Sequence, residues 1–268
     1  MEASEKSTPT AWDTAPTSVP SPRVRAVSAF FPCYNDAETI EAVVRRAEVA
    51  LRALVDDVEI IVVDDGSRDA SLRVLRDLAE VLPCLRVIPH FTNRGYGSAL
   101  LSGFAAAKNE WVFYTDGDGQ YDPSEVAMLI GAVGPSTDVV QGWKIARGDS
   151  WYRKVIGRVY HHVVARAFSL RVRDTDCDFR LFRRALLEPA QLESTSGVIC
   201  VEMMRRFHEL GAEFTEVPVH HYARQYGRSQ FFRLSHIARA SLQLAQLWVR
   251  CCIRHQRVPV DLHSGVDA

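Results

Sequence analysis

The alternation of strand-type and helix-type segments between residues 24 and 115 is the feature that most constrains the fold of this 268-residue chain. Apolar runs of strand length occur at 24–31, 58–63, 85–89 and 111–115, and the stretches between them repeat apolar residues at helical spacing. Because strands that alternate with helices form parallel sheets, this order predicts an α/β fold, a mostly parallel sheet with helices on both faces.

The second half of the chain is less regular. Its patterns predict helices over 150–168, 199–210 and 231–253, and short strands at 179–182 and 214–219. We expect four segments along the chain: a disordered tail rich in Ser, Thr and Pro, a main domain, an amphipathic basic helix and a second tail, at 1–22, 23–230, 231–256 and 257–268. The sequence has no run of about 18 apolar residues, so no transmembrane helix is expected.

Charge is distributed unevenly along the chain. The net charge of −1 hides eleven basic residues against four aspartates over 144–184, and seven arginines with no acidic residue over 224–257. Such segments predict an anionic partner. Aromatic residues beside the arginines favour an anionic membrane surface over nucleic acid, for which no motif is present. These aromatic residues are Trp151, Phe231, Phe232 and Trp248. A pair of ordinary core-packed amphipathic helices is the open alternative.

The six cysteines are scattered and have no metal-ligand spacing. We therefore interpret them as reduced thiols of a cytoplasmic protein. Together with the basic segments, this favours a peripheral position at the inner face of the membrane.

Acidic residues follow two of the predicted strands. Asp64 and Asp65 come directly after the second strand, and Asp116, Gly117 and Asp118 come after the fourth. Since ligands bind at the carboxyl ends of parallel strands, both clusters are site candidates. Two carboxylates separated by one glycine offer hard oxygen ligands to Mg²⁺ or Mn²⁺, and such a cation offsets charge on a departing diphosphate. An acidic surface turn, or a helix cap after the second strand, is the alternative interpretation.

Six motifs in order over about 25–232 resemble those of family 2 glycosyltransferases, in the branch of polyprenyl-phosphate sugar synthases similar to dolichol-phosphate mannose synthase. The motifs are FPCYND at 31–36, DDGSRD at 64–69, NRGYGSA at 93–99, DGDGQYDP at 116–123, DTDCDFR at 174–180, and EVPV at 216–219 followed by Arg224, Gly227 and Ser229.

The resemblance implies a GT-A (nucleotide-diphospho-sugar transferase) fold and a metal-dependent, inverting transferase. Its donor would be a nucleoside-diphosphate sugar, GDP-mannose or a UDP-hexose, and its acceptor a polyprenyl phosphate. The implied catalytic residues are Asp116, Asp118 and Arg224, and the implied Mg²⁺ or Mn²⁺ ligands are Asp116, Asp118 and Gln120. The implied nucleotide-binding residues are Pro32, Tyr34, Asp36, Val63, Asp65, Asp116, Gly117 and Lys144. The implied phosphate and acceptor residues are Arg147, Arg224, Arg228 and Gln230.

Three departures from the family pattern leave the donor and the acceptor open. Lys144 stands where Arg is common, Gln230 where Lys is common, and Asp178 where Gly is usual. A phosphate monoester, with a second pKa of about 6, needs no general base, whereas a hydroxyl acceptor does. Asp174, Asp176 and Asp178 are candidates for such a base. The alternatives are therefore a soluble glycosyltransferase acting on a hydroxyl, and a non-catalytic nucleotide-sugar-binding scaffold.

Overall fold

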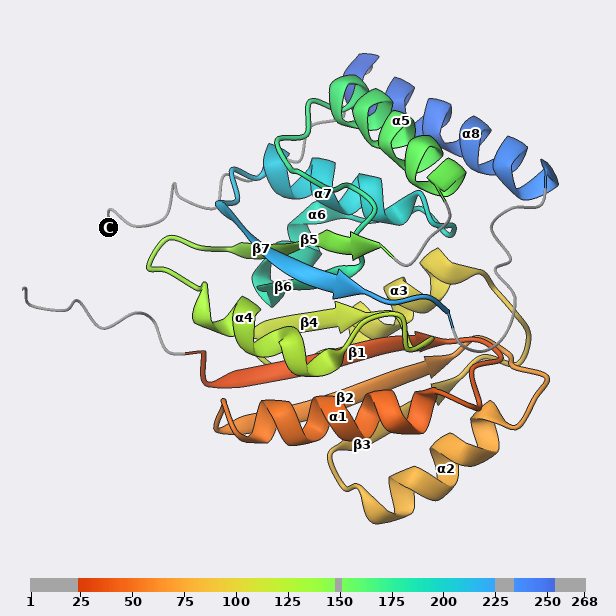
Figure 1. Cartoon of the computed structure of the whole chain (residues 1–268), viewed down its shortest axis with the longest axis vertical. Coiled ribbons are helices and arrows are strands. Elements are labelled where there is room, and N and C mark those ends of the chain that lie inside the picture. The colour runs from red at the N-terminus through yellow and green to blue at the C-terminus, as the bar shows by residue number, and fades with distance from the viewer. Residues whose placement is uncertain (1–23, 148–150, 225–233, 254–268) are drawn as a thin grey trace, which may run out of the picture.

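A seven-stranded sheet forms the centre of the computed structural model, which describes residues 24–147, 151–224 and 234–253 (Figure 1). The strand order is β3-β2-β1-β4-β6-β5-β7. β6 runs antiparallel to both of its neighbours, and the other neighbouring strands run parallel, so the predicted mostly parallel α/β sheet is confirmed. The strands are β1 Ala26–Cys33, β2 Asp57–Asp64, β3 Leu85–Pro89, β4 Trp111–Thr115, β5 Val139–Arg147, β6 Phe179–Arg183 and β7 Phe214–His221.

Helices cover both faces of the sheet. They are α1 Ile40–Arg52, α2 Ser71–Val81, α3 Tyr96–Ala106, α4 Val126–Gly131, α5 Trp151–Ala167, α6 Leu187–Ala190, α7 Ile199–Glu209 and α8 Leu234–Trp248. The 3₁₀ turns Pro123–Glu125 and Arg184–Leu186 precede α4 and α6, and the π-helical turn Val249–Ile253 follows α8. None of the described helices combines the length and the hydropathy needed to cross a lipid bilayer.

Successive residues of the central strand β1 point into two different cores. Phe31 packs in the cluster formed with α1, α2 and α4, whereas Phe30 packs with α3 and α7 on the opposite face. This alternation is the period of two that strands impose on their side chains. Both phenylalanines are fully buried, so β1 is anchored from both faces and its carboxyl end is held in place.

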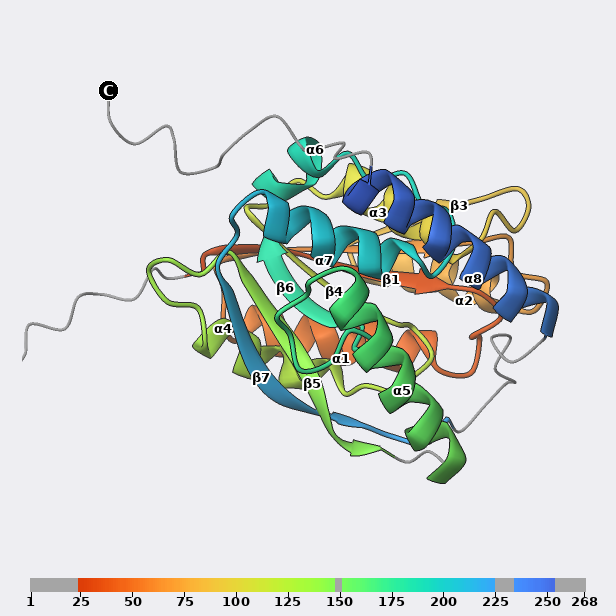
Figure 2. The same cartoon turned by 90° about the horizontal axis from the view of Figure 1, so that it is seen from above.

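A third core joins α5, α7 and α8 on one side of the molecule (Figure 2). Phe168, Met204 and Leu247 contribute to it from these three parts of the chain. The indole N–H of Trp248 donates to the carbonyl of Ala167 at 2.9 Å, which ties the end of α8 to the end of α5. The predicted helices at 150–168 and 231–253 correspond to α5 and to α8 with its π-helical turn. The predicted tails at 1–22 and 257–268 lie outside the described residues.

Strand β1 ends two residues later than its apolar run suggests. Pro32 belongs to β1 and pairs with Val63 of β2, but the pairing of β1 with β4 has already ended at Phe30. The missing N–H of proline therefore costs the β4 ladder no hydrogen bond. The sequence patterns also missed β5 and α4, because neither shows a clear period of its own.

Candidate functional site

The turns that follow β1 and β2 are hydrogen-bonded to each other. The backbone N–H of Asn35 donates to Ser67 Oγ at 2.9 Å, and the N–H of Asp36 donates to Ser71 Oγ at 3.0 Å. The N–H of Arg68 donates in return to Asn35 Oδ1 at 2.8 Å. Two motifs separated by about thirty residues in sequence thus form one rigid wall at the carboxyl edge of the sheet.

Asp36 presents a carboxylate at this wall. Its Oδ2 accepts a hydrogen bond from the N–H of Tyr34 at 3.1 Å. Burial, together with the nearby carboxylate of Asp118, raises the pKa of Asp36 to about 6, against the lowering effects of the Tyr34 N–H and of Arg224. The ionised form of Asp36 is therefore disfavoured mainly by burial, and secondarily by the negative charge of Asp118.

Asp65, predicted to bind the nucleotide, has both carboxylate oxygens occupied by protein groups. Oδ1 lies 2.6 Å from His90 Nδ1 and accepts from the N–H of Arg94 at 2.9 Å, and Oδ2 accepts from the N–H of Gly95 at 2.9 Å. These contacts fix the turn that begins α3. Val63 is fully buried, so nothing in its placement supports the predicted nucleotide contact.

The turn after β4 packs tightly against the end of β1. A Cβ at Gly117 would lie 2.9 Å from the carbonyl oxygen of Pro32, closer than real Cβ atoms approach, so only glycine fits. Thr39 Oγ1 donates to the carbonyl of Gly117 at 3.0 Å, and Gly119 has a φ of 74°. The glycines of this turn therefore serve the backbone, and they hold Asp116 and Asp118 beside Asp36.

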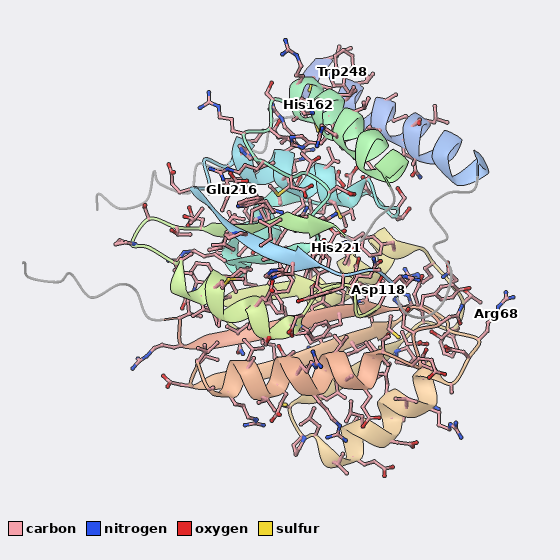
Figure 3. The ribbon with its side chains drawn as sticks, viewed as in Figure 1. Arg68, Asp118, His162, Glu216, His221 and Trp248 are labelled. Atoms are coloured by element: carbon pink, nitrogen blue, oxygen red, sulfur yellow. The ribbon has the colours of Figure 1, made fainter. Side chains whose placement is uncertain are left out.

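Asp116 and Asp118 lie close to each other and to further carboxylates. Asp116 accepts from the hydroxyl of Tyr96 at 2.8 Å, yet burial raises its pKa well above the usual value, and Asp178 and Asp118 add to the rise. Asp118 accepts from the N–H of Gln120 at 3.0 Å and forms an ion pair with Arg224. Figure 3 shows Asp118 at the side of the molecule toward which β1, β2 and β4 point.

The chain after β7 crosses to this turn and delivers Arg224. The N–H of Tyr222 donates to the carbonyl of Gln120 at 2.8 Å, and Gln120 Nε2 donates to the carbonyl of Tyr222 at 3.1 Å. The three residues predicted as catalytic, Asp116, Asp118 and Arg224, are therefore brought together.

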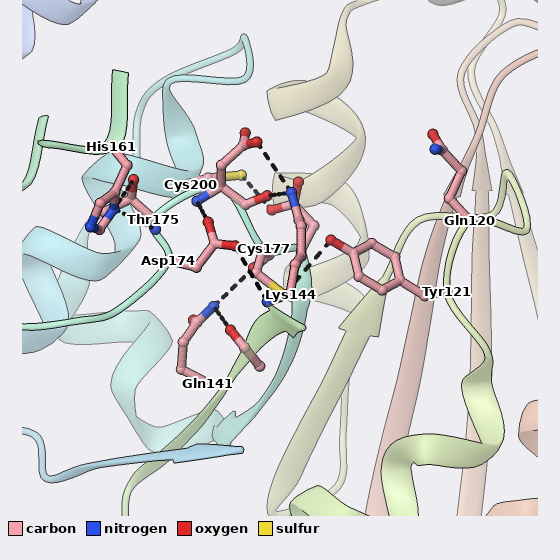
Figure 4. Close-up of polar contacts among 12 residues, drawn as sticks. Gln120, Tyr121, Gln141, Lys144, His161, Asp174, Thr175, Cys177 and Cys200 are labelled. Atoms are coloured by element: carbon pink, nitrogen blue, oxygen red, sulfur yellow. Dashed lines mark hydrogen bonds and ion pairs between the residues drawn. The ribbon is translucent and has the colours of Figure 1, made fainter. Parts of the chain in front are cut away.

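The donor set fits a divalent cation that is shared with a substrate. Among the described residues no group of three or more His, Cys, Asp or Glu side chains is arranged to hold a metal ion. Mg²⁺ is commonly held by one or two carboxylates, with substrate phosphates and water filling the remaining positions, and Asp116 and Asp118 match that pattern. The mutual repulsion of these carboxylates also favours a cation. Gln120, predicted as a third ligand, points to Tyr222 instead and stands apart from the polar group around Lys144 (Figure 4).

Lys144 lies farther along the same edge, on β5. Its ammonium group contacts Asp176, with Nζ 3.2 Å from Asp176 Oδ2. Beside it is a cavity of about 550 Å³ between β5, α5 and the segment before β6. The cavity is lined by Trp143, Lys144, Ile145, Gly157, Arg158, His161, His162, Arg173 and Asp174. Arg228, Gln230 and the side chain of Arg147, predicted to bind phosphate, lie outside the described part of the chain.

Asp178 is held in a network of contacts that its place in the sequence did not predict. Its Oδ1 accepts from the hydroxyl of Tyr114 at 2.7 Å and lies 3.2 Å from Cys200 Sγ. Arg180, which is fully buried, adds an ion pair at 3.5 Å. The only signal in the sequence was an aspartate where the resembling family usually has glycine.

Comparison with known protein families identifies a match to the family described as "Glycosyl transferase family 2" over residues 28–189. Two curated relatives are undecaprenyl-phosphate 4-deoxy-4-formamido-L-arabinose transferases. The relative from Enterobacter sp. (strain 638) is 30% identical over 210 residues, and the one from Pseudomonas fluorescens (strain Pf0-1) is 32% identical over 212 residues. Each alignment covers 78% of this chain, but only 63% and 61% of the respective relatives. The chain thus spans less than two thirds of their length.

Solved structures share the fold at lower sequence identity. Glucosyl-3-phosphoglycerate synthase from Mycobacterium tuberculosis, in complex with Mn²⁺, uridine-diphosphate and glucosyl-3-phosphoglycerate, is similar with a TM-score of 0.65 and 21% identity, covering 85% of this chain and 80% of that one. The same enzyme in complex with Mg²⁺ and uridine-diphosphate gives a TM-score of 0.63 and 19% identity, with coverage of 85% and 79%. The likeness establishes the fold, which is that of GT-A glycosyltransferases.

Proposed function

Because this chain belongs to glycosyl transferase family 2, we propose that it transfers a sugar from a nucleoside-diphosphate sugar to a polyprenyl phosphate, with Mg²⁺ or Mn²⁺ as cofactor. The observation that carries the proposal is the meeting of Asp116, Asp118 and Arg224 at one edge of the sheet. Two carboxylates with excess negative charge suit a cation, and an adjacent guanidinium suits a phosphate.

On this proposal the edge from β2 to β4 binds the donor. The wall of Tyr34, Asp36 and the turn after β2 takes the base and ribose, and Asp116 and Asp118 hold the cation. When bound, the cation stabilises the negative charge that develops on the departing nucleoside diphosphate. Arg224 exchanges its contact with Asp118 for a phosphate oxygen, which keeps its charge paired throughout.

The basic cavity beside β5 suits the phosphate of the acceptor. Lys144, Arg158 and Arg173 line it, and Asp174 is its one acidic lining residue among those described. A phosphate monoester is largely dianionic near pH 7, so one of its oxygens attacks the anomeric carbon without a general base. The bond from that carbon to the diphosphate breaks as the new bond forms, and the configuration inverts. The similarity to relatives named undecaprenyl-phosphate transferases supports this class of acceptor.

An anionic membrane surface is the proposed location of the reaction, at its cytoplasmic side. The stretches 151–173 and 224–257 contain no acidic residue. Exposed apolar side chains lie on the same elements as arginines, including Val159 and Val163 on α5 and Leu242 on α8. Such a mixture of basic and apolar side chains favours adsorption to anionic lipid.

Product extraction tests the proposal. Purified protein is incubated with Mn²⁺, a radiolabelled GDP- or UDP-sugar and polyprenyl phosphate in detergent, and the organic phase is counted before and after mild acid. Label that enters the organic phase and is released by acid supports the proposal. Label that remains in a stable water-soluble glycoside contradicts it and supports transfer to a hydroxyl instead, for which Asp178 offers a carboxylate at the site. If donors bind tightly but no product forms, the result would support a non-catalytic nucleotide-sugar-binding scaffold.

A further inference from the structure

We propose that Asp178 is a specificity-determining residue that accepts a hydrogen bond from a hydroxyl of the transferred sugar. The inference rests on the proposed function for the nucleotide-sugar site, and it concerns a part of the donor that neither the cation nor the nucleotide wall contacts. It predicts that the sugar is neutral at the position facing Asp178.

Strands β4 and β6 are paired beside the candidate site. These antiparallel strands are in register from Trp111 opposite Arg183 to Thr115 opposite Phe179. Asp116 and Asp178 come one residue beyond the last paired positions, Thr115 and Phe179, so the end of this pairing brings both carboxylates to the same edge of the sheet. Asp178 is also the carboxylate that contributes most to the raised pKa of Asp116 after burial itself.

Asp178 is held through one of its two carboxylate oxygens. All its contacts with described residues, from Tyr114, Cys200 and Arg180, are made by Oδ1. Oδ2 has no hydrogen-bond partner among the described residues. Arg180 is itself held by Gln141 Oε1 at 2.6 Å and contacts the hydroxyl of Tyr114. A buried framework thus fixes one oxygen and leaves the other for a ligand, with the side chain 20% exposed.

The order of the strands along the carboxyl edge indicates where each part of the donor lies. From one side to the other the order is β2, β1, β4 and β6. A nucleoside-diphosphate sugar is a linear molecule of base, ribose, diphosphate and sugar. With the base and ribose at β2 and β1, and the diphosphate and cation at β4, the sugar lies next along the edge, at β6. Asp178 is the first residue on the chain before β6.

Charge decides between the sugar and the acceptor phosphate as the partner of Oδ2. A carboxylate that faced an incoming phosphate dianion would repel it, whereas a carboxylate makes strong hydrogen bonds to neutral hydroxyls. The basic cavity at β5 lies on the far side of β6 from Asp116, so the acceptor phosphate has cationic partners of its own. Asp178 therefore faces the sugar, and a uronic acid with its own carboxylate is excluded.

The test compares the binding of nucleotides with and without a sugar. Equilibrium dissociation constants are measured with Mn²⁺ by calorimetry for UDP, UDP-glucose and UDP-glucuronate, and for GDP and GDP-mannose. The dissociation constant of the bare nucleotide divided by that of the nucleotide-sugar gives the contribution of the sugar. A distant effect on the cation changes both constants alike and cancels in this ratio. We expect Asp178→Asn to weaken the neutral sugar contribution by about 10- to 100-fold, and to reduce the discrimination against UDP-glucuronate.

The control sits at the other end of the same strand pair. Glu110, before β4, is 2.6 Å from Arg183 of β6 in an exposed ion pair, so Glu110→Gln removes one carboxylate from the far end of the pair. It should leave all the ratios unchanged. Asp178→Glu keeps the charge but moves the carboxylate oxygen, so this variant should lower the ratio. Thermal melting checks that the variant retains its fold.

Two results would overturn the assignment. An unchanged ratio in a folded Asp178→Asn variant would mean that the carboxylate does not contact the sugar. A loss of turnover of more than about 100-fold with an unchanged ratio would make Asp178 a general base for a hydroxyl acceptor. If the wild-type protein binds no nucleotide-sugar at all, the proposed function itself fails, and that outcome is separate because it is read before any variant is compared.

Discussion

The acidic pair at the end of β2 and the acidic pair after β4 look alike in sequence, but their surroundings in the structure differ. The second residue of the first pair, Asp65, is buried and accepts from His90 and from two backbone N–H groups. Asp116, in the second pair, accepts one hydrogen bond from Tyr96 and lies near three further carboxylates, those of Asp178, Asp118 and Asp36. Asp65 is satisfied by the protein, whereas Asp116 and its neighbours carry charge that the described residues leave partly uncompensated.

The difference separates a structural carboxylate from a functional one. A buried charge with all its hydrogen bonds made stabilises the surrounding turn, and its removal costs stability. Carboxylates that oppose one another cost stability when the site is empty and gain it when a cation binds. Mutations in the two pairs should therefore affect different measurements.

The largest effect is expected at Asp118. Replacing it in Asp118→Ala removes one of two proposed cation ligands, and turnover should fall on the order of 10³-fold, as for other groups that stabilise developing charge. Thermal stability should change little, because the lost ion pair with Arg224 is offset by reduced repulsion with Asp116. Steady-state transfer assays and melting curves check both expectations. A variant that melts far below the wild type would place Asp118 in the same structural class as Asp65.

Asp65→Asn should show the opposite pattern. The amide cannot accept from His90 and from both backbone groups as the carboxylate does, so the free energy of unfolding should fall by about 3 kcal/mol. For a domain of this size that corresponds to a lowering of the melting temperature by roughly 6–12 °C. Urea denaturation provides the measurement. Wild-type stability with a large loss of nucleotide affinity would show instead that Asp65 contacts the ligand directly.

The sequence predicted the parts of this comparison that depend on local pattern. The strands before both acidic pairs, and the gathering of their carboxyl ends at one edge, follow from apolar runs such as 58–63 and from the parallel topology. The partners of the carboxylates did not follow. Asp65 meets His90 and Asp116 faces Asp178 only through tertiary contacts, and the antiparallel direction of β6 has no signature in a strand of five residues.

Asp36, which lies near Asp118 of the second pair, should give the pH dependence. Its pKa is raised to about 6, mainly by burial, so between pH 4 and pH 6 the folded protein keeps a proton that the unfolded chain has lost. The free energy of unfolding therefore falls as the pH rises through this window, by about 2 kcal/mol after allowance for partial exposure.

Asp36→Asn keeps the shape of the side chain but removes its titration. The variant should match the wild type near pH 4 and exceed it in stability at pH 7 by that same amount. Denaturant titrations at pH 4, 5, 6 and 7 measure the difference. A constant difference across the series would mean that the folded protein does not raise the pKa of Asp36.

The smallest effect is expected at Ser102, and it asks whether the Asp65 cluster is structural throughout. His90 Nε2 lies 3.0 Å from Ser102 Oγ, and His90 Nδ1 contacts Asp65. The three side chains are therefore connected in the same order as in a Ser-His-Asp triad. A catalytic relay would need the hydroxyl to reach a substrate, but Ser102 lies within α3, six residues after Tyr96, the residue of this helix that contacts Asp116. Ser102→Ala should cost about 1 kcal/mol of stability and leave sugar transfer unchanged. A large loss of transfer in this variant would give the carboxylate after β2 a chemical role, and the distinction between the two acidic pairs would fail.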